Sequence, residues 1–324
     1  MRAHESMMRP APAFWNVGEK MGDYLSAYTG SKPPVPSTIP ELDRMLRGGF
    51  RPGVHFVGGT TGAGKSSFCL WLAARIAQSE DPDTGQPTGV TYVSLELGMP
   101  EVRARMGSRL SYVLDGLEPW RWADFEELGR KQAAAIADGT YEPANDPVYS
   151  ADIELMVRCP NLRIVDAISD GNASSLVYIC EEIRSTGAHG GRVLFLDYLQ
   201  CIDALPGQDE TEALRDSVRA VNLAAIRAGV AVVAISAISR AKGSEMRKGK
   251  SGDNPGADIF RGSSWIEYTG LTAFALVRRD DSVQRGEFAD VELWPVKNRR
   301  GTCDGPVRLA YNGAYGEWSY GADE

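Results

Sequence analysis

Over most of its length the chain alternates between short apolar runs and longer segments whose apolar residues recur at helical spacing. The apolar runs have the length of buried strands and comprise residues 54–57, 90–95, 162–165, 193–196 and 230–235. The segments between them favour helices and comprise residues 65–78, 100–114, 121–138, 173–187 and 211–228. Strands joined by helical crossovers form a mostly parallel, twisted sheet that is covered by helices on both faces. The pattern therefore predicts an α/β fold.

The pattern changes towards the C-terminus, where three strand-like pieces follow at residues 271–277, 289–296 and 307–311. The last two flank the turn-rich residues 297–301, and this arrangement predicts a C-terminal β-hairpin. Residues 81–88 and 138–146 are polar and contain Pro or Gly, so we expect surface excursions there.

The N-terminal residues differ from the rest of the chain. Residues 14–28 carry apolar side chains that approximate one helical face, and residues 31–36 form a Pro-rich stretch. We therefore expect residues 1–37 to be an extension with a candidate linker helix and a Pro-rich linker. One domain should follow over residues 38–320, beginning with a short helix at 38–46.

The composition fits a folded chain of 324 residues with 43% hydrophobic residues and a net charge of −8. No apolar run is long enough for a membrane span, and the N-terminus lacks the apolar core of a signal peptide. The acidic balance argues against a protein that coats nucleic acid with its whole surface, although a local basic channel remains compatible with it. The cysteines are scattered, with no C-x-x-C pair, as in a reducing compartment: Cys69, Cys159, Cys180, Cys201 and Cys303. These features favour a cytoplasmic protein without a membrane partner.

A phosphate-binding loop lies between the first predicted strand and the helix that follows it. The segment reads G-T-T-G-A-G-K-S, a complete G-x-x-x-x-G-K-[ST] motif in the context that the motif requires. Its glycines allow successive N–H groups to face phosphate oxygens, Lys65 should reach the β- and γ-phosphates, and the Ser66 hydroxyl should bind Mg²⁺. The predicted cofactors are ATP and Mg²⁺. The predicted nucleotide-binding residues are Gly59, Thr60, Thr61, Gly62, Ala63, Gly64, Lys65, Ser66 and Ser67.

Two acidic residues at strand ends complete the candidate chemistry. Residues 193–196 run into Asp197 as in a Walker B strand, whose carboxylate holds the Mg²⁺ shell. A second apolar strand runs into Glu96, a candidate general base for the attacking water. From the strand alone, an exposed Glu at a strand end without a catalytic role is an equal alternative for Glu96.

Taken in order, these segments resemble the C-terminal motor domain of the DnaB-type replicative helicases, a RecA-like ATPase family, over roughly residues 38–318. Residues 94–97 resemble the "SLEM" segment of the family, and Asp197-Tyr198-Leu199-Gln200 equals its "DYLQ" signature. Weaker matches cover residues 42–53, 235–240 ("LSQLNR") and 261–267 ("RESGSIEQ"), and the hairpin matches "KxRxG…VxLxFNG" at residues 297–301 and 307–313.

The resemblance implies roles for individual residues. Glu96 would be the catalytic base, and Lys297 and Arg299 of the hairpin would reach the γ-phosphate in the active site of a neighbouring subunit. It also implies a homo-oligomer, a ring and most simply a hexamer, that translocates on single-stranded DNA with ATP. The implied fold is a RecA-like P-loop domain.

The chain departs from the family pattern in two places. Ala237 stands where the family has the Gln of "SQLNR", and Ala cannot sense a phosphate through its side chain. We therefore expect weak coupling between nucleotide state and DNA. Only about 37 residues precede Thr38, so we expect the collar and primase-binding roles of the family's N-terminal domain not to transfer. A separate loader or collar protein is then a candidate partner.

A basic segment follows the fifth strand, where the family has its central-channel loop. Its basic residues are Arg240, Lys242, Arg247, Lys248 and Lys250. In a ring, several copies would line one pore and bind the phosphates of single-stranded DNA with little sequence preference, since the loop has no aromatic residue for base stacking. The alternative is a solvated loop without a ligand.

The sequence leaves three functions open. The first is an ATP-dependent, DnaB-like DNA helicase motor. The second is a RecA-like regulatory ATPase that unwinds nothing, which Ala237 favours. The third is a recombination mediator that forms filaments, against which the "DYLQ" segment and the hairpin argue. The host process and the polarity of translocation stay open.

Overall fold

The computed structural model describes residues 31–169, 174–204, 207–238, 269–278 and 286–321, together with Gly22, Pro255, Ile259 and Phe260. Its contacts divide the chain into two units, Met1–Pro33 and Pro34–Glu324. The helix expected at residues 14–28 lies outside the described residues apart from Gly22. The residues before Thr38 are partly integrated into the second unit. Val35 is buried and exchanges backbone hydrogen bonds of 2.8 and 2.7 Å with Phe50, so residues from Pro34 onward are not a free linker.

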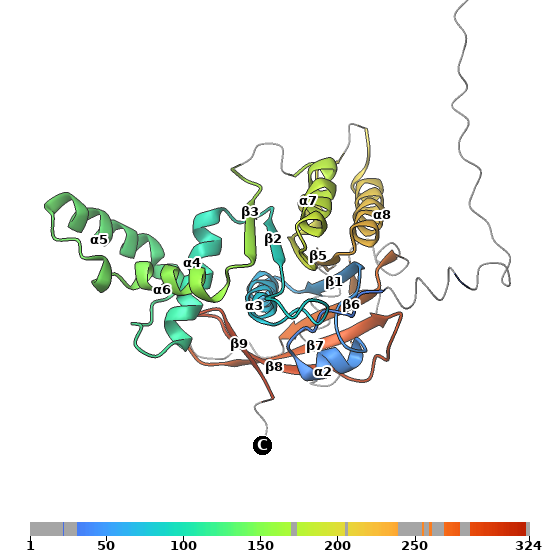
Figure 1. Ribbon diagram of the computed structural model, residues 1–324, viewed down its shortest axis with the longest axis horizontal. Helices are drawn as coiled ribbons and strands as arrows, with labels where there is room; N and C mark the ends of the chain where they lie inside the picture. The colour runs from blue at the N-terminus through green and yellow to red at the C-terminus, as the bar shows by residue number, and fades with distance from the viewer. Residues whose placement is uncertain are drawn as a thin grey trace, which may run out of the picture. The chain divides into compact units, whose positions relative to one another are not determined.

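In the described part of the chain the strands form one nine-stranded sheet in the order β3-β2-β4-β5-β1-β6-β7-β8-β9 (Figure 1). The strands from β3 to β6 in this order are parallel, and β6 to β9 are antiparallel neighbours. Their bounds are β1 Gly53–Gly59, β2 Val90–Ser94, β3 Leu162–Asp166, β4 Val193–Asp197, β5 Ala231–Ala237, β6 Thr272–Arg278, β7 Ala289–Asn298, β8 Val307–Asn312 and β9 Glu317–Tyr320. This is the predicted mostly parallel α/β sheet, extended by an antiparallel edge.

Helix α2 precedes β1, and the other helices come between the parallel strands in sequence, as the hydrophobic pattern predicts. They are α2 Pro40–Met45, α3 Lys65–Gln78, α4 Met99–Val113, α5 Phe125–Asp138, α6 Pro147–Arg158, α7 Leu176–Ala188 and α8 Glu210–Ala228. Three short 3₁₀ helices are η1 Trp122–Asp124, η2 Pro143–Asn145 and η3 Leu199–Cys201. Helix α6 was missed by the sequence analysis. It begins where Asp146 accepts hydrogen bonds from the backbone N–H groups of Val148 and Tyr149, with Pro147 in its first turn.

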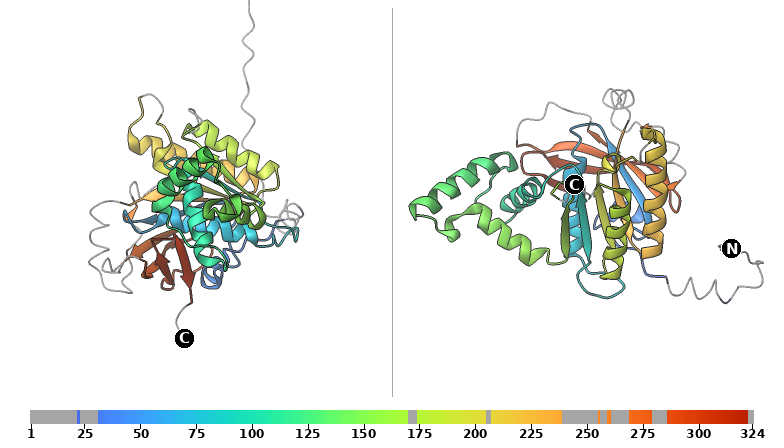
Figure 2. Two further views of the ribbon diagram at one scale, coloured as in Figure 1. Left: turned by 90° about the vertical axis from the view of Figure 1, so that its left-hand side faces the viewer. Right: turned by 90° about the horizontal axis from the view of Figure 1, so that it is seen from above.

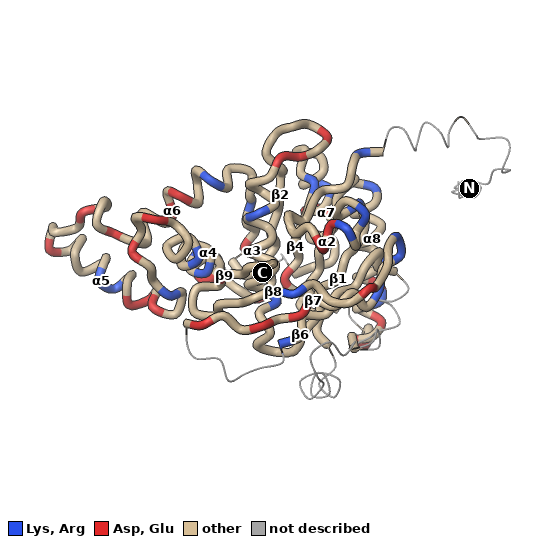
Figure 3. The backbone as a smooth tube through the Cα atoms, turned by 90° about the horizontal axis from the view of Figure 1, so that it is seen from below, with Lys and Arg blue, Asp and Glu red and all other residues tan. Residues whose placement is uncertain are grey.

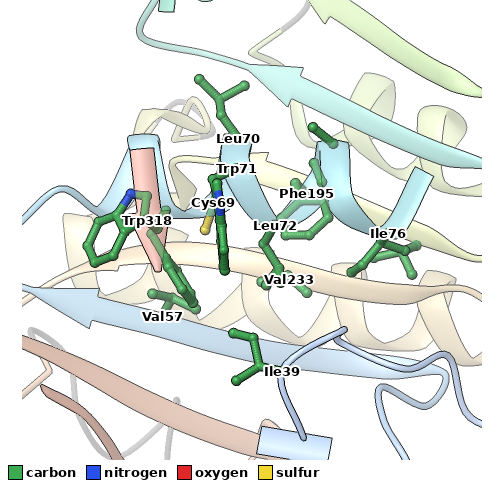
Figure 4. Close-up of a cluster of buried hydrophobic side chains, with 14 of the residues drawn as sticks. Ile39, Val57, Cys69, Leu70, Trp71, Leu72, Ile76, Phe195, Val233 and Trp318 are labelled. Atoms are coloured by element: carbon green, nitrogen blue, oxygen red, sulfur yellow. The ribbon is translucent and has the colours of Figure 1, made fainter. Parts of the chain in front are cut away.

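Alternation along the central strands divides the core between the two faces of the sheet. Val54 and Phe56 of β1 pack with α7 and α8, whereas Val57 packs on the opposite face with α2 and α3. In β5, Val232 and Val233 divide in the same way. Figure 4 shows side chains of α3 packed against Val57, Phe195 and Val233, with Trp318 at one end of the cluster. Helices packed on both faces hold the central strands in place. Side chains at the ends of these strands therefore have fixed positions.

The predicted C-terminal hairpin is present. Strands β7 and β8 pair antiparallel from Ala289 with Tyr311 to Leu293 with Val307. Beyond this point β7 continues without β8 but stays paired with β6, so residues 297–300, which include Lys297, Arg299 and Arg300, extend past the end of β8. Strand β9, which was not predicted, adds to β8 and places Trp318 in the core beside α3.

Residues 115–158, here called the helical arm, lie between α4 and β3 and extend away from the sheet (Figures 1 and 2). Trp120 is buried with Ala104 and Ala151 in a small core of its own, against which Phe125 packs. Helix α5 has no buried residue, so the arm exposes most of its surface. Among the described helices, none is long and apolar enough to cross a membrane.

Candidate active site

A cavity of about 410 Å³ opens at the carboxyl ends of the parallel strands. It collects residues that are far apart in sequence because the parallel strands all end at this edge of the sheet. Its lining residues are Thr61, Gly62, Gly64, Lys65, Ser66, Ser67, Glu96, Arg105, Trp122, Asp197, Tyr198, Ile235, Ala237, Tyr311 and Gly316. The structure thus brings together the phosphate loop, Glu96 and Asp197 as the sequence predicts. Of the predicted nucleotide-binding residues, Gly59, Thr60 and Ala63 do not line the cavity.

The phosphate loop depends on glycine at defined positions. Gly62 and Gly64 have φ angles of +82° and +86°, in the left-handed region that favours glycine. Gly64 is also crowded, because a Cβ atom there would lie 2.8 Å from Trp318 and 3.0 Å from Tyr311. The loop is therefore held by the C-terminal strands, and its backbone conformation depends on their packing.

Lys65 begins α3 and its ammonium group stays over the loop. Its Nζ donates hydrogen bonds of 3.2 Å to the carbonyl oxygens of Gly59 and Thr60. Burial lowers the pKa of Lys65, and the nearby carboxylates of Asp197 and Glu96 oppose this shift. A cation held inside the loop by backbone carbonyls is positioned to pair with phosphate oxygens.

Asp197 ends β4 and is 1% exposed. Its Oδ2 accepts a hydrogen bond of 2.7 Å from the Tyr92 hydroxyl, whereas its Oδ1 is buried without a hydrogen-bond partner. Burial raises the pKa of Asp197, and the hydroxyls of Tyr92 and Ser66 and the charge of Lys65 oppose this rise. An unpartnered buried carboxylate oxygen next to a Ser hydroxyl fits a Mg²⁺ ligand, because Mg²⁺ takes one or two protein oxygens and completes its shell with phosphate and water.

Glu96 lies two residues beyond the end of β2 and is exposed to the cavity. Its position relative to Asp197 is fixed by the backbone, since the N–H of Leu95 donates a hydrogen bond of 2.6 Å to the carbonyl oxygen of Asp197. A carboxylate that faces solvent beside the phosphate loop can accept a proton from a water molecule.

Ala237 ends β5 at the wall of the cavity, where the sequence analysis noted the absence of a sensing Gln. Gln200 makes the polar connection at this point. Its amide donates to Ser236 Oγ over 2.9 Å and accepts from the Ala237 N–H over 3.1 Å. The segment that follows Asp197 is therefore hydrogen-bonded directly to the end of β5.

Seven residues of the lining were not among the predicted site residues, and three of them, Arg105, Trp122 and Tyr311, carry large side chains from α4, the helical arm and the C-terminal strands. Arg105 of α4 lies over the ring of Trp122, 4.6 Å from its centroid, and Trp122 Nε1 donates a hydrogen bond of 3.1 Å to the carbonyl oxygen of Gly313. Tyr311 stacks on Trp318 at 4.2 Å. The aromatic pair Trp120 and Trp122 was a visible sequence signal, but only the fold shows which of the two faces the cavity.

Lys297 and Arg299 do not line the cavity. Lys297 pairs with Ala273 near the start of β6, and the backbone N–H of Arg299 donates a hydrogen bond of 3.0 Å to the carbonyl oxygen of Leu271. The start of β6 lies towards the amino ends of the parallel strands, and the phosphate loop lies at their carboxyl ends.

The distance between Lys297 and the phosphate loop of the same chain can be estimated from the strand register. Ala273 pairs with Phe56 of β1, three residues before Gly59. At about 3.3 Å per residue, Lys297 lies roughly 10 Å back along the strands from the phosphate loop, and β6 separates its strand from β1, which leads into the loop. The candidate DNA-binding residues Arg240, Lys242, Arg247, Lys248 and Lys250 lie outside the described residues.

Comparisons with known proteins identify the family and the fold. The family model of the DnaB-like helicase C terminal domain matches residues 34–319. The structure is similar to the ATPase domain of G40P, with a TM-score of 0.69 and 23% identity over 94% of this chain and 99% of that one. It is also similar to a DnaB-like replicative helicase solved to study its interactions with primase, with a TM-score of 0.68 and 22% identity over 94% of this chain and 68% of that one.

A curated relative adds a partial match. The DNA repair protein RadA of Halalkalibacterium halodurans is 33% identical over 110 residues, which cover 34% of this chain and 22% of RadA. The two structural likenesses establish the RecA-like fold, while the family model covers nearly the whole folded unit. On that match the chain belongs to the DnaB-like helicases, and its folded unit is their ATP-hydrolysing C-terminal domain.

Proposed function

We propose that this chain is the motor of a ring that hydrolyses MgATP at subunit interfaces and translocates on single-stranded DNA. The observation that carries the proposal is the position of Arg299. It lies at the amino ends of the parallel strands, whereas the phosphate loop lies at their carboxyl ends. It therefore cannot reach the cavity of its own subunit unless β7 unfolds. A neighbouring subunit that packs this end of its sheet against the cavity would complete the site.

Each residue has a defined part in the proposed reaction. Lys65 and the loop N–H groups bind the β- and γ-phosphates, and Glu96 accepts the proton of the attacking water. Ser66 and Asp197 hold Mg²⁺, which when bound neutralises charge on the phosphates. Lys297 and Arg299 of the neighbour stabilise the charge of the transferred phosphoryl group, a contribution that reaches about 10³- to 10⁵-fold in rate in related chemistries.

A mixing experiment tests the interface. Glu96→Gln and Arg299→Ala subunits should each bind ATP and assemble, yet hydrolyse it at least about 100-fold more slowly than the wild type. Mixed in equal amounts, they should regain turnover, because some interfaces pair an intact Glu96 with an intact Arg299. Lys65→Ala serves as the control, since it should abolish turnover and weaken nucleotide binding in the subunit that carries it.

The outcome separates two arrangements. Recovery on mixing requires that Glu96 and Arg299 belong to different subunits of one site. If mixed assembly is demonstrated by mass and no ratio of the two variants recovers activity, Arg299 acts within its own subunit or not at all.

Ala237 favours a second candidate function, a regulatory ATPase whose nucleotide state is not coupled to DNA. The cavity wall at this position offers no side-chain donor to a phosphate. Titration of the ATPase rate with single-stranded DNA distinguishes the two. Strong stimulation of the wild type supports the motor. No stimulation, together with a gain in Ala237→Gln, supports the regulatory role.

The DNA contact is proposed for the basic loop. Changing Arg247, Lys248 and Lys250 together to Ala should weaken binding of single-stranded DNA equally for all sequences and reduce its salt dependence, because fewer counterions are released. The basal ATPase rate should be unchanged. Equal DNA affinity in wild type and triple variant would remove the loop from the proposal.

A further inference from the structure

The turn after β7 is organised around the side chain of Asn298. The Asn298 Oδ1 accepts hydrogen bonds from the backbone N–H groups of Arg300, over 3.2 Å, and Gly301, over 3.0 Å. Its Nδ2 donates hydrogen bonds to the carbonyl oxygens of Met45, over 2.8 Å, and Thr302, over 3.2 Å. A side-chain amide has two N–H donors and an oxygen that accepts two hydrogen bonds, so Asn298 uses its full capacity within the protein.

One of these bonds fastens the turn to α2. Met45 is the last residue of α2, and carbonyl groups at a helix end lack a partner within the helix. The backbone of the turn lies against the same carbonyl, because a Cβ atom at Gly301 would be 2.1 Å from the Met45 oxygen. Helix α2 is held in turn by the side chains of Leu42 and of Leu46, the residue after Met45, which are buried in the core. The turn therefore rests on a fixed part of the fold.

Asn298 also fixes the backbone on one side of Arg299. The peptide group before Arg299 is fixed by the Arg299 N–H, which donates a hydrogen bond of 3.0 Å to the carbonyl oxygen of Leu271. The peptide group after Arg299 is fixed by the bond from the Arg300 N–H to Asn298 Oδ1. The exposed side chain of Arg299 starts between these two groups, and its Nε donates a hydrogen bond of 3.1 Å to the carbonyl oxygen of Gly270. Asn298 and the residues that lead into β6 therefore set the direction in which Arg299 leaves the sheet.

The two segments that Asn298 joins are both basic. Residues 44–51 contain three Arg, and residues 297–300 contain one Lys and two Arg (Figure 3). Glu41 and Asp43 of α2 offset part of this charge. The remaining positive charge suits a surface that faces the phosphates of a nucleotide. Asn298 itself is uncharged, and the hairpin pattern KxRxG leaves its position open, so its hydrogen bonds define its part.

We propose that Asn298 is a positioning residue, which holds the turn so that Arg299 reaches the transferred phosphate in the cavity of a neighbouring subunit. This role rests on the proposed function of Arg299 at the subunit interface. A guanidinium group stabilises the charge of the reacting phosphate only within hydrogen-bond distance, and a displacement of about 1 Å can cost about 100-fold in rate. Loss of the Asn298 amide frees the peptide group after Arg299 and releases the turn from α2, so Arg299 would no longer be held in one position.

The test measures the steady-state ATPase activity of the full chain carrying Asn298→Ala. The value of kcat should fall about 10- to 100-fold, whereas KM for ATP should stay within twofold, because the phosphate loop of the same subunit is unchanged. Asn161→Ala is the matched control and should leave kcat unchanged. Asn161 also donates a side-chain hydrogen bond across the fold, of 2.7 Å to the carbonyl oxygen of Pro87, but five strands lie between β3, which follows it, and β7.

Two further measurements separate positioning from a general loss of stability. If Asn298 acts through Arg299, adding Asn298→Ala to Arg299→Ala should lower kcat no further, because the two changes remove the same interaction. Equal amounts of Asn298→Ala and Glu96→Gln subunits should recover turnover, since the cavity of the Asn298→Ala subunit is intact and can receive Arg299 from its neighbour. An unstable fold would give neither result.

The outcomes distinguish this role from the proposed function itself. Wild-type kcat in Arg299→Ala would refute the proposed function of Arg299, and with it the role of Asn298. A slow Arg299→Ala together with wild-type kcat in Asn298→Ala would overturn the role of Asn298 alone. The same follows if Asn161→Ala lowers kcat as much as Asn298→Ala, or if the double variant is slower than Arg299→Ala by the full effect of Asn298→Ala. It also follows if Glu96→Gln subunits restore turnover to Arg299→Ala but not to Asn298→Ala.

Discussion

Replacing Trp122 tests whether the helical arm contributes to nucleotide binding. Trp122 is part of η1 in the arm, lines the cavity beside Arg105, and donates a hydrogen bond to the carbonyl oxygen of Gly313, which follows β8. We predict that it covers the base or ribose of bound ATP, because it is an aromatic side chain in the wall of the cavity that also holds the phosphate loop. Trp122→Ala should therefore raise KM for ATP and change kcat little.

The magnitude follows from the contacts. Stacking of a base on an aromatic side chain contributes about 1–3 kcal/mol, which corresponds to roughly 5- to 150-fold in affinity. Trp122 is 37% exposed and its contact with Arg105 is reached by water, so the lower half of this range applies. We expect KM to rise about tenfold. Trp122→Phe should lose only part of this, because it keeps a ring but not the hydrogen bond to Gly313.

Steady-state ATPase assays give KM and kcat, and displacement titrations with inorganic tripolyphosphate give the control. Tripolyphosphate has no base, so its affinity should be the same in wild type and Trp122→Ala. A KM within twofold of the wild type would refute the position of the base. A parallel loss of tripolyphosphate affinity would instead indicate that Trp122 only supports the loop.

The other predictions concern residues beneath the site. Tyr92→Phe removes the hydrogen bond to Asp197 and should raise the Mg²⁺ concentration required for half-maximal ATPase activity about 10- to 100-fold, measured by Mg²⁺ titration; an unchanged requirement would show that the Tyr92 hydroxyl does not support the metal site. Gly64→Ala should abolish nucleotide binding, whereas Gly139→Ala, also at positive φ but in open space, should cost only about 1 kcal/mol of stability in urea melts and leave binding intact. His55 is buried, and burial lowers its pKa to about 4. Between pH 7 and pH 5 the imidazole is protonated in the unfolded chain but not in the folded protein, so the free energy of unfolding should fall by about 2 kcal/mol over this range. In urea melts at each pH, His55→Gln should lack this dependence of the free energy of unfolding on pH.

The fold was accessible from the sequence where burial alone determines structure. The central strands are buried on both faces and read as continuous apolar runs, and the pattern of α3 predicted both of its ends. The pattern failed in the C-terminal strand β9 and in α6. Strand β9 has only four residues, which is too short for a periodic signal. Helix α6 does repeat apolar residues at helical spacing, at Tyr149, Ile153, Met156 and Val157, but the sequence analysis did not use this pattern.

The residues of the site also divide into those that the sequence could identify and those that it could not. Lys65, Ser66, Glu96 and Asp197 occur in local motifs, and the parallel topology places them together. Arg105, Trp122 and Tyr311 could not be assigned, because they meet only through the packing of the arm against the C-terminal strands. The proposed roles of Lys297 and Arg299 involve a neighbouring subunit, and their distance from the cavity of their own chain is consistent with that proposal.

The opposite placement of the phosphate loop and Arg299 on one rigid sheet has a consequence for counting sites. If Arg299 serves the site of a neighbour as proposed, each subunit contributes one Arg299 at one end of the sheet and receives one at the other, so the interface is heterologous and the number of complete sites equals the number of interfaces. A closed ring of n subunits then has n complete sites, whereas an open chain of the same length has n − 1. Opening such a ring, for instance to admit a DNA strand, would leave one ATP site without a neighbour's Arg299, and the per-subunit ATPase rate would itself report whether the ring is shut.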